Sequence, residues 1–401
     1  MLVCGTITEY NPFHHGHSFQ LSETRRRLGE EIPCVAVMSG CFVQRGQPAY
    51  FPPSVRAEMA VKSGADLVVE LPLTAALSSA EGFAWGGIAV LQALGFVTHF
   101  SFGSELGEIH PFLEMARILT RPDFSKKITD QLTCGISYAA ARQKALAAEA
   151  PALASLLSAP NNILGAEYCK ALLGTNIQPL TIPRRGAGHD SQTPEPPFAS
   201  ASYLRQLLRK DPAACRSFLP PKAYVVLQRA WEAGCRPYNP EKLELLLLAS
   251  GRRLTVSQLA QLPDAAEGLE NRLHEALYHS ASLAECLARA KSKRYPESRI
   301  RRMLMCALLG ITQRDTRLPL SYIRVLAFNE RGRQLLRLAK DTCTVPLLIR
   351  PTQGKALTGD AARLLNLDVY AHDIFSLIGG SPQPGGGFFR QSPGYFPLST
   401  L

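Results

Sequence analysis

The amino-acid sequence predicts an α/β protein, with a parallel sheet in its first half and an α-rich second half. Up to about residue 200, short apolar runs bounded by turn residues alternate with longer stretches of helical character. Strict alternation of this kind is typical of parallel strands joined by right-handed crossovers. After about residue 210, helical stretches follow one another. Because 401 residues exceed one ordinary core, we expect two domains, at residues 1–210 and 211–401.

The individual elements follow from the same patterns. Buried strands are expected at residues 2–8, 33–39, 66–71, 99–102 and 178–182, with one short strand at 343–349. Helices are expected at residues 16–28, 54–63, 81–94, 222–234, 240–250, 255–262, 267–289 and 298–309. Two segments rich in Gly and Pro are expected to be a loop, at 186–198, and a loosely ordered tail, at 379–401.

Loops of small, polar and charged residues follow the first four predicted strands. They comprise residues 9–17, 39–47, 70–74 and 102–105. Ligands of parallel α/β sheets bind at the carboxyl ends of the strands. We therefore expect these four loops to line one mouth.

Composition excludes several classes of protein. No run of about 18 uncharged apolar residues occurs, and residues 1–15 lack the features of a signal peptide, so a cytoplasmic protein without a membrane span is expected. Ten cysteines are scattered without a CxxC pair. Such scatter favours reduced, buried thiols over disulfides or a thiolate metal site.

The net charge of +11 lies almost wholly in the second half of the chain. Residues 1–190 hold 15 basic and 16 acidic residues, whereas residues 191–401 hold 29 and 17. A basic half suggests a polyanionic partner, with nucleic acid first and an anionic membrane surface second. Because the basic residues are dispersed, an ordinary solvated surface is the alternative.

Three histidines and a glycine, His14 to His17, stand between the first strand and the first helix. Gly16 lets the backbone approach a bound phosphate, and the helix start directs N–H groups and positive dipole toward it. His14 and His17, three residues apart, can share one side of the first turn and donate hydrogen bonds to phosphate oxygens. A metal site and a merely polar turn are the alternatives. His15 is the replaceable member of the cluster.

Six motifs in chain order resemble the bacterial tRNA(Met) cytidine acetate ligase family, a branch of the HIGH-motif nucleotidyltransferases. They are EYNPFHHGH at 9–17, MSGCFVQRG at 38–46, GADLVVELP at 64–72, FGSE at 102–105, NNILG at 161–165 and RYPESRIRR at 294–302. The likeness runs from residue 2 to about residue 375. Its specificity comes from the agreement of six separate motifs.

The resemblance implies a Rossmann-like HUP nucleotidyltransferase domain, followed by an α-rich tRNA-binding domain. Members of the family activate acetate with ATP as acetyl-adenylate and acetylate N4 of the wobble cytidine, position 34, of elongator tRNA(Met). The ATP contacts carried over from the family are Ile7, Thr8, Glu9, Tyr10, Asn11, Pro12, Phe13, His14, His15, Gly16, His17, Ser18, Phe19, Gln20, Gly103, Asn161 or Asn162, and Arg184. We favour Asn162 of the pair. Mg²⁺ is expected as a phosphate counter-ion, although no carboxylate cluster indicates its site.

Two further loops complete the expected site. Arg45, after the second strand, is expected to offset carboxylate or phosphate charge, and it is a catalytic candidate together with His14 and His17. Ser200 and Ser202, at a predicted helix start, either bind the β and γ phosphates or form an ordinary N-cap. The chain departs from the family at Pro52–Pro53, where a DKW-like stretch is expected. That departure puts the role of the missing lysine in question.

A basic stretch in the second half is the candidate RNA contact. Its basic residues surround Tyr295, an arrangement that suits an RNA backbone and a stacked base, and they are Lys293, Arg294, Arg299, Arg301 and Arg302. The outward face of an amphipathic helix is the alternative. Two other functions remain open: a small-molecule adenylyltransferase of the same fold, and a non-catalytic nucleotide- and RNA-binding protein. No protein partner is indicated.

Overall fold

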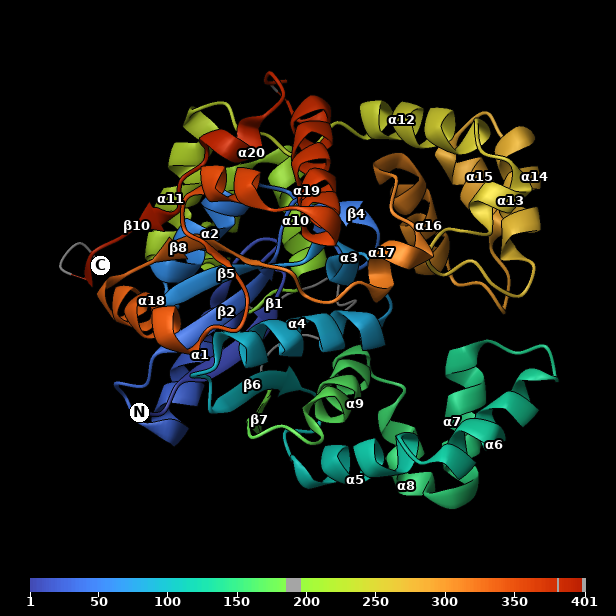
Figure 1. Cartoon of the computed structure of the whole chain (residues 1–401), viewed down its shortest axis with the longest axis horizontal. Helices are drawn as coiled ribbons and strands as arrows, with labels where there is room; N and C mark the ends of the chain where they lie inside the picture. The colour runs from blue at the N-terminus through green and yellow to red at the C-terminus, as the bar shows by residue number, and fades with distance from the viewer. Residues whose placement is uncertain (185–195, 381, 399–401) are drawn as a thin grey trace.

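A mostly parallel sheet forms the centre of the molecule (Figure 1). The computed structural model describes residues 1–184, 196–380 and 382–398. The sheet has the order β10-β8-β5-β2-β1-β6-β7, with β9 paired to β8. Its parallel strands from the first half are β1 (Cys4–Thr8), β2 (Cys34–Ser39), β5 (Leu67–Leu71), β6 (His99–Ser104) and β7 (Gln178–Pro183). The α/β prediction and these five strands are confirmed.

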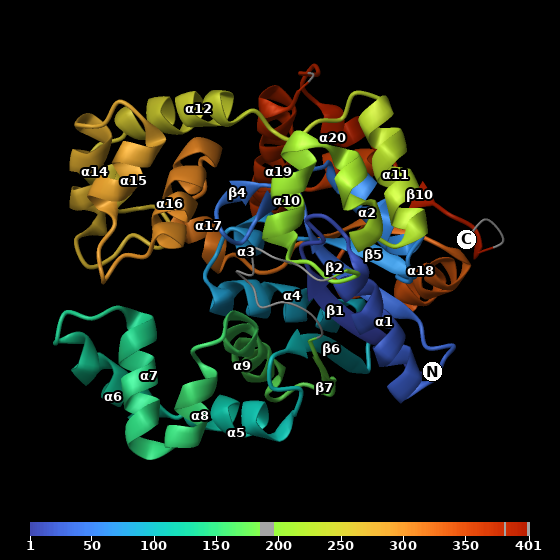
Figure 2. The ribbon, with the colours of Figure 1, turned by 180° about the vertical axis from the view of Figure 1, so that it is seen from behind.

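Helices cover both faces of the sheet. On one face, Val35, Val37 and Val69 pack against α4 (Ala80–Leu94), α9 (Pro160–Leu172) and α18 (Glu330–Thr342). On the other face, Ala36 and Met38 pack against α1 (His15–Leu28), α2 (Pro53–Val61), α10 (Ala201–Lys210) and α11 (Pro221–Glu232). Figure 2 shows α1 and α10 in front of the sheet. Alternate residues of one strand therefore belong to two different cores, as expected for a sheet buried on both faces.

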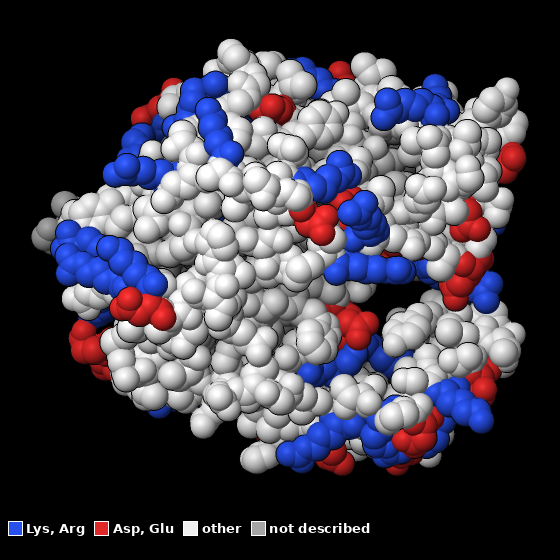
Figure 3. Space-filling view, in the orientation of Figure 1, with Lys and Arg blue, Asp and Glu red and all other residues white. Residues whose placement is uncertain are grey.

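Two helical lobes extend from the same side of the sheet and leave a hollow between them (Figures 1 and 3). One lobe contains α5 (His110–Leu119), α6 (Pro122–Leu132), α7 (Tyr138–Glu149) and α8 (Pro151–Leu156). The other contains α12 (Pro240–Arg252), α13 (Val256–Leu259), α14 (Leu269–Tyr278), α15 (Leu283–Ala290) and α16 (Glu297–Leu309). The first lobe was not anticipated from the sequence.

The chain returns to the sheet after the second lobe. Strand β8 (Ile323–Phe328) pairs antiparallel with β5, and β10 (Gly394–Tyr395) pairs with β8. The remaining elements are α3 (Leu73–Ala76), β3 (Phe42–Val43), β4 (Gln47–Pro48), the 3₁₀ helices at Pro212–Phe218 and Pro351–Ala356, α17 (Gln313–Arg317), β9 (Leu347–Leu348), α19 (Gly359–Ile378) and α20 (Gly387–Arg390). The chain after residue 210 therefore contributes strands to the sheet that the first half begins. The second half is α-rich, as predicted, but it supplies part of the central sheet.

Three local expectations were wrong. The helix expected at 267–289 is two helices, because the side chain of Ser282 accepts a hydrogen bond from the backbone N–H of Glu285 and starts a new helix. The strand expected at 343–349 is reduced to the two residues of β9. The tail expected to be loosely ordered buries Phe388, which is 1% exposed, and adds β10 to the sheet. The expected loop 186–198 lies mostly outside the described residues.

The cysteine expectation agrees with the structure. All ten thiols are free, and most of them are buried. Burial raises the pKa of Cys34 to about 11, so this thiol stays protonated at neutral pH. Within the described residues, no helix is long and apolar enough to cross a membrane.

Candidate functional site

A cavity of about 680 Å³ lies at the carboxyl ends of β1 and β6. Its walls come from the β1–α1 loop, the β3–β4 turn, α4, α9, α10 and the start of α16. A cleft of about 40 Å³ adjoins it and shares His17, Gln20, Gly103 and Arg184 with it. The predicted ATP contacts that line the cavity, the cleft or both are Ile7, Thr8, Glu9, Tyr10, Asn11, His14, Gly16, His17, Phe19, Gln20, Gly103, Asn161 and Arg184. The loops after β1, β2 and β6 thus meet at one mouth, whereas the fourth expected loop, residues 70–74 after β5, does not line this cavity.

The histidine cluster forms the N-terminal cap of α1. His14 Nδ1 accepts a hydrogen bond from the backbone N–H of Gly16 at 3.0 Å, and His17 Nδ1 accepts one from the N–H of His14 at 3.2 Å. The two ring centroids lie 3.8 Å apart. A Cβ on Gly16 would lie 2.8 Å from His14 Cε1, so glycine is needed for the ring to fold back onto the helix. The expectation that both rings share one side of the first turn is confirmed.

These hydrogen bonds fix the tautomer of both imidazoles. A ring nitrogen that accepts a hydrogen bond carries no proton, so in a neutral imidazole the proton is on Nε2. Burial, together with the nearby Arg184 cation, lowers the pKa of His14 to about 3. Burial and the neighbouring His14 lower the pKa of His17 as well. Both rings are therefore neutral at pH 7 and can each donate one hydrogen bond from Nε2 to an anion.

Four arginines from separate segments converge on the cavity. They are Arg45 of the β3–β4 turn, Arg184 after β7, Arg205 of α10 and Arg301 of α16. Arg205 is held by hydrogen bonds from its guanidinium to the Asn11 carbonyl oxygen at 3.0 Å and to Ser202 Oγ at 3.1 Å. Their opposing carboxylates at the cavity are Glu9 and Glu297. The arrangement favours a ligand with several negative charges.

A buried arginine that sequence reasoning missed fixes the surrounding loops. Arg56 is fully buried, and its guanidinium donates hydrogen bonds to the backbone carbonyls of Phe51, Glu9, Ser39 and Gly40. Burial lowers its pKa to about 10, so it stays charged at neutral pH. One side chain thereby joins the loops after β1 and β2. The signal available in the sequence was an arginine inside the apolar stretch that follows Pro52–Pro53.

The departure at Pro52–Pro53 has a structural role. Pro53 is the first residue of α2, a position that proline favours because its missing N–H has no partner there. The preceding Phe51 is fully buried in the core between α1, α2 and α10. Neither proline lines the cavity.

The two asparagines have different environments. Asn162 is 4% exposed, and its Oδ1 accepts hydrogen bonds from the backbone N–H groups of Glu105 and Leu106. Asn161 lines the cavity, and its Oδ1 lies 3.5 Å from an Arg184 guanidinium nitrogen that donates to it. The geometry therefore favours Asn161 over Asn162 as the residue that faces a ligand.

Several other predicted contacts lie away from the cavity. His15, Pro12, Phe13 and Ser18 do not line it, and Phe13 is fully buried. Ser200 caps α10, since its Oγ accepts from the N–H of Tyr203 at 3.1 Å. Ser202 contacts the site through Arg205. The structure thus places the two serines as a cap and a support.

Most arginines of the basic stretch form ion pairs within the second lobe, and one of them lines the cavity. Arg302 is buried, and its Nε donates to Asp264 Oδ2 at 2.7 Å. Arg299 donates to the Asp264 carbonyl and pairs with Glu267, and Arg294 lies 4.0 Å from the same Glu267. Lys293 is exposed. Of the five candidates, only Arg301 lines the cavity.

Within the described residues, no three His, Cys, Asp or Glu side chains are grouped as metal ligands. The histidine cluster itself forms a helix cap with two neutral rings. The site combines two neutral donors at a helix start with converging guanidinium groups. This combination is the chemistry of a phosphate-binding site.

Comparison with known proteins shows the family of the chain. The family model described as "HIGH Nucleotidyl Transferase" matches residues 1–385. The chain belongs to this nucleotidyltransferase family.

Relatives within the family are similar over nearly their whole length. The tRNA(Met) cytidine acetate ligase of Thermoanaerobacter pseudethanolicus is 37% identical over 387 residues, which cover 94% of this chain and 95% of the relative. That of Clostridium acetobutylicum is 34% identical over 411 residues, covering 98% and 99%. The crystal structure of Thermotoga maritima TmcAL in its apo form has a TM-score of 0.93 at 32% identity and covers 99% of this chain and 100% of that one. A second structure of the Thermotoga protein, bound with alpha-thio ATP, has a TM-score of 0.92. The chain is thus a member of the tRNA(Met) cytidine acetate ligase family, as the sequence motifs indicated.

Proposed function

We propose that this protein activates acetate with ATP as acetyl-adenylate and then acetylates N4 of the wobble cytidine of elongator tRNA(Met). The observation that carries the proposal is the convergence of Arg45, Arg184, Arg205 and Arg301 on a cavity beside the neutral His14–His17 pair. A triphosphate supplies the negative charge that these groups match. The relatives are named tRNA(Met) cytidine acetate ligases, and this name indicates that the acetyl group is transferred to a cytidine of tRNA(Met).

In the first step, a carboxylate oxygen of acetate attacks the α-phosphorus of ATP, and pyrophosphate leaves. Negative charge then builds on the α-phosphate oxygens, and the neutral rings of His14 and His17, both of which line the cleft, donate hydrogen bonds to them from Nε2. Because the rings are already oriented by the helix cap, little reorganisation is needed. The arginines hold the β and γ phosphates and the departing pyrophosphate.

In the second step, the exocyclic amine of cytidine attacks the carbonyl carbon of acetyl-adenylate. The C–N bond forms, the bond between the carbonyl carbon and the phosphate oxygen breaks, AMP leaves, and the amine loses a proton. The start of α16 contributes Glu297, Ser298 and Arg301 to the same cavity. The second half of the chain therefore reaches the place where both substrates would meet.

Mg²⁺ fits this site only as a counter-ion of the phosphates. Glu9 and Glu297 are the carboxylates that line the cavity, and Glu9 Oε1 already accepts a hydrogen bond from the N–H of Gln44 at 2.8 Å. The ion would be held mainly by phosphate oxygens and water, which is a usual environment for Mg²⁺. It would neutralise phosphate charge there.

Pyrophosphate release, measured with ATP and acetate in the presence and absence of tRNA, tests the proposal. We expect acetate-dependent release without tRNA, and N4-acetylcytidine in digested elongator tRNA(Met) when tRNA is present. An RNA with uridine at the wobble position is the matched control. Absence of acetate-dependent release would refute the activation step. Release with unmodified tRNA would refute the transfer step and favour a small-molecule adenylyltransferase.

A further inference from the structure

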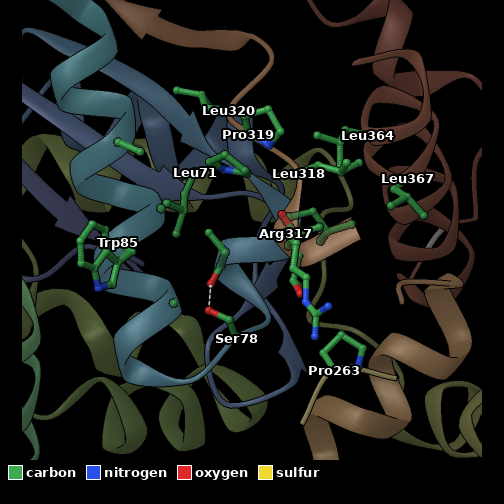
Figure 4. Close-up of a pocket in the computed structure, with 18 of the residues that line it drawn as sticks. Leu71, Ser78, Trp85, Pro263, Arg317, Leu318, Pro319, Leu320, Leu364 and Leu367 are labelled. Carbon is green, nitrogen blue, oxygen red and sulfur yellow. Dashed lines mark hydrogen bonds between the residues drawn. The ribbon is translucent and has the colours of Figure 1, made fainter. Parts of the chain in front are cut away.

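A second cavity, of about 570 Å³, lies on the far side of α4 from the proposed active site (Figure 4). Its apolar walls are formed by Leu71, Leu73, Leu318, Leu320 and Leu367. None of the residues assigned above to ATP or acetate lines it. Its volume is in the range of small-ligand sites in proteins.

Two exposed side chains from different helices line this cavity. Trp85 of α4 is 49% exposed, although its indole ring is the largest side chain on that helix. Arg317, at the end of α17, is exposed and has no ion-pair partner among the described residues. Figure 4 shows the two on opposite sides of the cavity. A half-exposed indole opposite an unpaired guanidinium offers a stacking surface and a cation.

The floor of the cavity is polar and buried. Arg324 Nη1 donates to Glu70 Oε2 at 2.9 Å, and Tyr322 Oη donates to Asp368 Oδ2 at 2.5 Å. The Nε of Arg324 is buried and has no hydrogen-bond partner among the described residues. Burial and the nearby Glu70 raise the pKa of Asp368 well above its usual range. One unpartnered donor, Arg324 Nε, and the carboxylates of Glu70 and Asp368 thus belong to residues that line this cavity.

The first turns of α4 separate this cavity from the proposed active site. Ser79, Gly82 and Trp85 line the second cavity, whereas Ala80 and Phe83 line the first. A helix with its side chains is about 10 Å across. The two cavities therefore lie about one helix diameter apart, on different sides of α4.

We propose that this second cavity binds a base of the anticodon loop that flanks the acetylated cytidine, stacked on Trp85, with a neighbouring phosphate on Arg317. The proposal rests on the proposed function, since it needs tRNA as the substrate. Single-stranded RNA is commonly bound by bases splayed onto aromatic side chains. A site for a neighbouring base would fix the position of the anticodon loop, so that the amine of the reacting cytidine lies next to the acetyl-adenylate.

Trp85 provides its own probe, because the chain contains only two tryptophans. In a Trp231→Phe variant, the remaining emission reports on Trp85 alone. We expect an anticodon stem-loop RNA to quench it, and an abasic replacement at one flanking position to abolish the quench. ATP alone should leave the emission unchanged. Quenching by ATP alone would overturn the proposal. So would quenching that persists with an abasic replacement at each of the flanking positions.

Binding measurements give an independent readout. Trp85→Ala should weaken stem-loop binding roughly ten-fold, the size that one stacked base supplies, and the abasic RNA should show no further loss with this variant. Acetate-dependent pyrophosphate release without tRNA should be unchanged. Tyr278→Ala, which removes a 77% exposed aromatic from α14, is the matched control and should leave affinity intact.

The two proposals fail in distinguishable ways. Loss of acetate-dependent pyrophosphate release in the unaltered protein would contradict the proposed function, whatever Trp85 does. Additive losses from Trp85→Ala and the abasic RNA would refute the base site while leaving the proposed function intact. Equal affinity of the unaltered protein and Trp85→Ala would refute it as well.

Discussion

Replacing His14 by alanine should affect stability and rate through two separable contacts. The side chain caps α1 through Nδ1, which accepts from the Gly16 N–H at 3.0 Å. His14 also lines the cleft, where we propose that its Nε2–H donates to phosphate. Loss of an N-cap costs about 1 kcal/mol. Loss of one preorganised donor to the developing phosphate charge costs about 100-fold or more in rate.

The variant His14→Asn separates these two effects. Asparagine is among the preferred N-cap residues, so its Oδ1 can accept from the Gly16 N–H and restore the lost stability. Its short amide ends near the backbone and cannot reach the position of Nε2. We therefore expect His14→Asn to unfold at the same denaturant concentration as the unaltered protein, yet to form acetyl-adenylate as slowly as His14→Ala.

Acetate-dependent exchange of labelled pyrophosphate into ATP measures the activation step, and urea unfolding measures the stability. Exchange by His14→Asn at the full rate would refute the assignment of Nε2 as a phosphate donor. Equal exchange by all three proteins would remove His14 from the mechanism. Loss of stability in both variants would show that the imidazole packing against His17, with centroids 3.8 Å apart, matters more than the cap.

Three further predictions concern the site and its supports. Arg302→Ala should lower the free energy of unfolding by about 2 kcal/mol, because it removes a buried guanidinium and its charged hydrogen bond to the partly exposed Asp264. Arg301→Ala should instead leave urea unfolding unchanged and reduce acetyl-adenylate formation at least ten-fold. Asn161→Ala should raise the KM for ATP, measured by steady-state kinetics, with little change in the free energy of unfolding. Asn162→Ala should lower the free energy of unfolding, measured with urea, with little change in the KM for ATP. The rate of pyrophosphate exchange should show no inflection near pH 6.5, because burial lowers the pKa of His14 to about 3. The free energy of unfolding should decrease as the pH is lowered from about 6.5, since only the unfolded chain takes up a proton on His14 in that range.

The parallel half of the fold could be predicted because its signals are local. Each strand from β1 to β7 in the main sheet is a short apolar run, and the sheet buries both faces. Strand β8 was missed although Ile323–Phe328 is also apolar. Arg324 interrupts that run, and its partner Glu70 lies 254 residues earlier in the chain. Pairing over such a distance leaves no trace in local pattern.

The geometry of the histidine cluster could be predicted from sequence because it is set within one helical turn. Which arginine of the basic stretch lines the cavity could not be predicted. Arg301 and Arg302 are adjacent, yet one lines the cavity and the other is buried against Asp264. Neighbouring residues on a helix point about 100° apart, so their fates depend on what packs against each face. That information belongs to the tertiary structure.

A close backbone contact joins the two halves of the chain beside the cavity. Gly46 has φ +70, and a Cβ there would lie 2.6 Å from the backbone carbon of Arg301, so the β3–β4 turn packs directly on the α16 backbone. That contact places Arg45 and Arg301 at the same cavity, although they are far apart in the chain. The two halves are joined at two places, by the pairing of β5 with β8 and by the contact of the β3–β4 turn with α16. A shift of one half relative to the other would therefore separate Arg45 from Arg301. The positive charge that lines the proposed ATP site is thus assembled by the packing of the two halves.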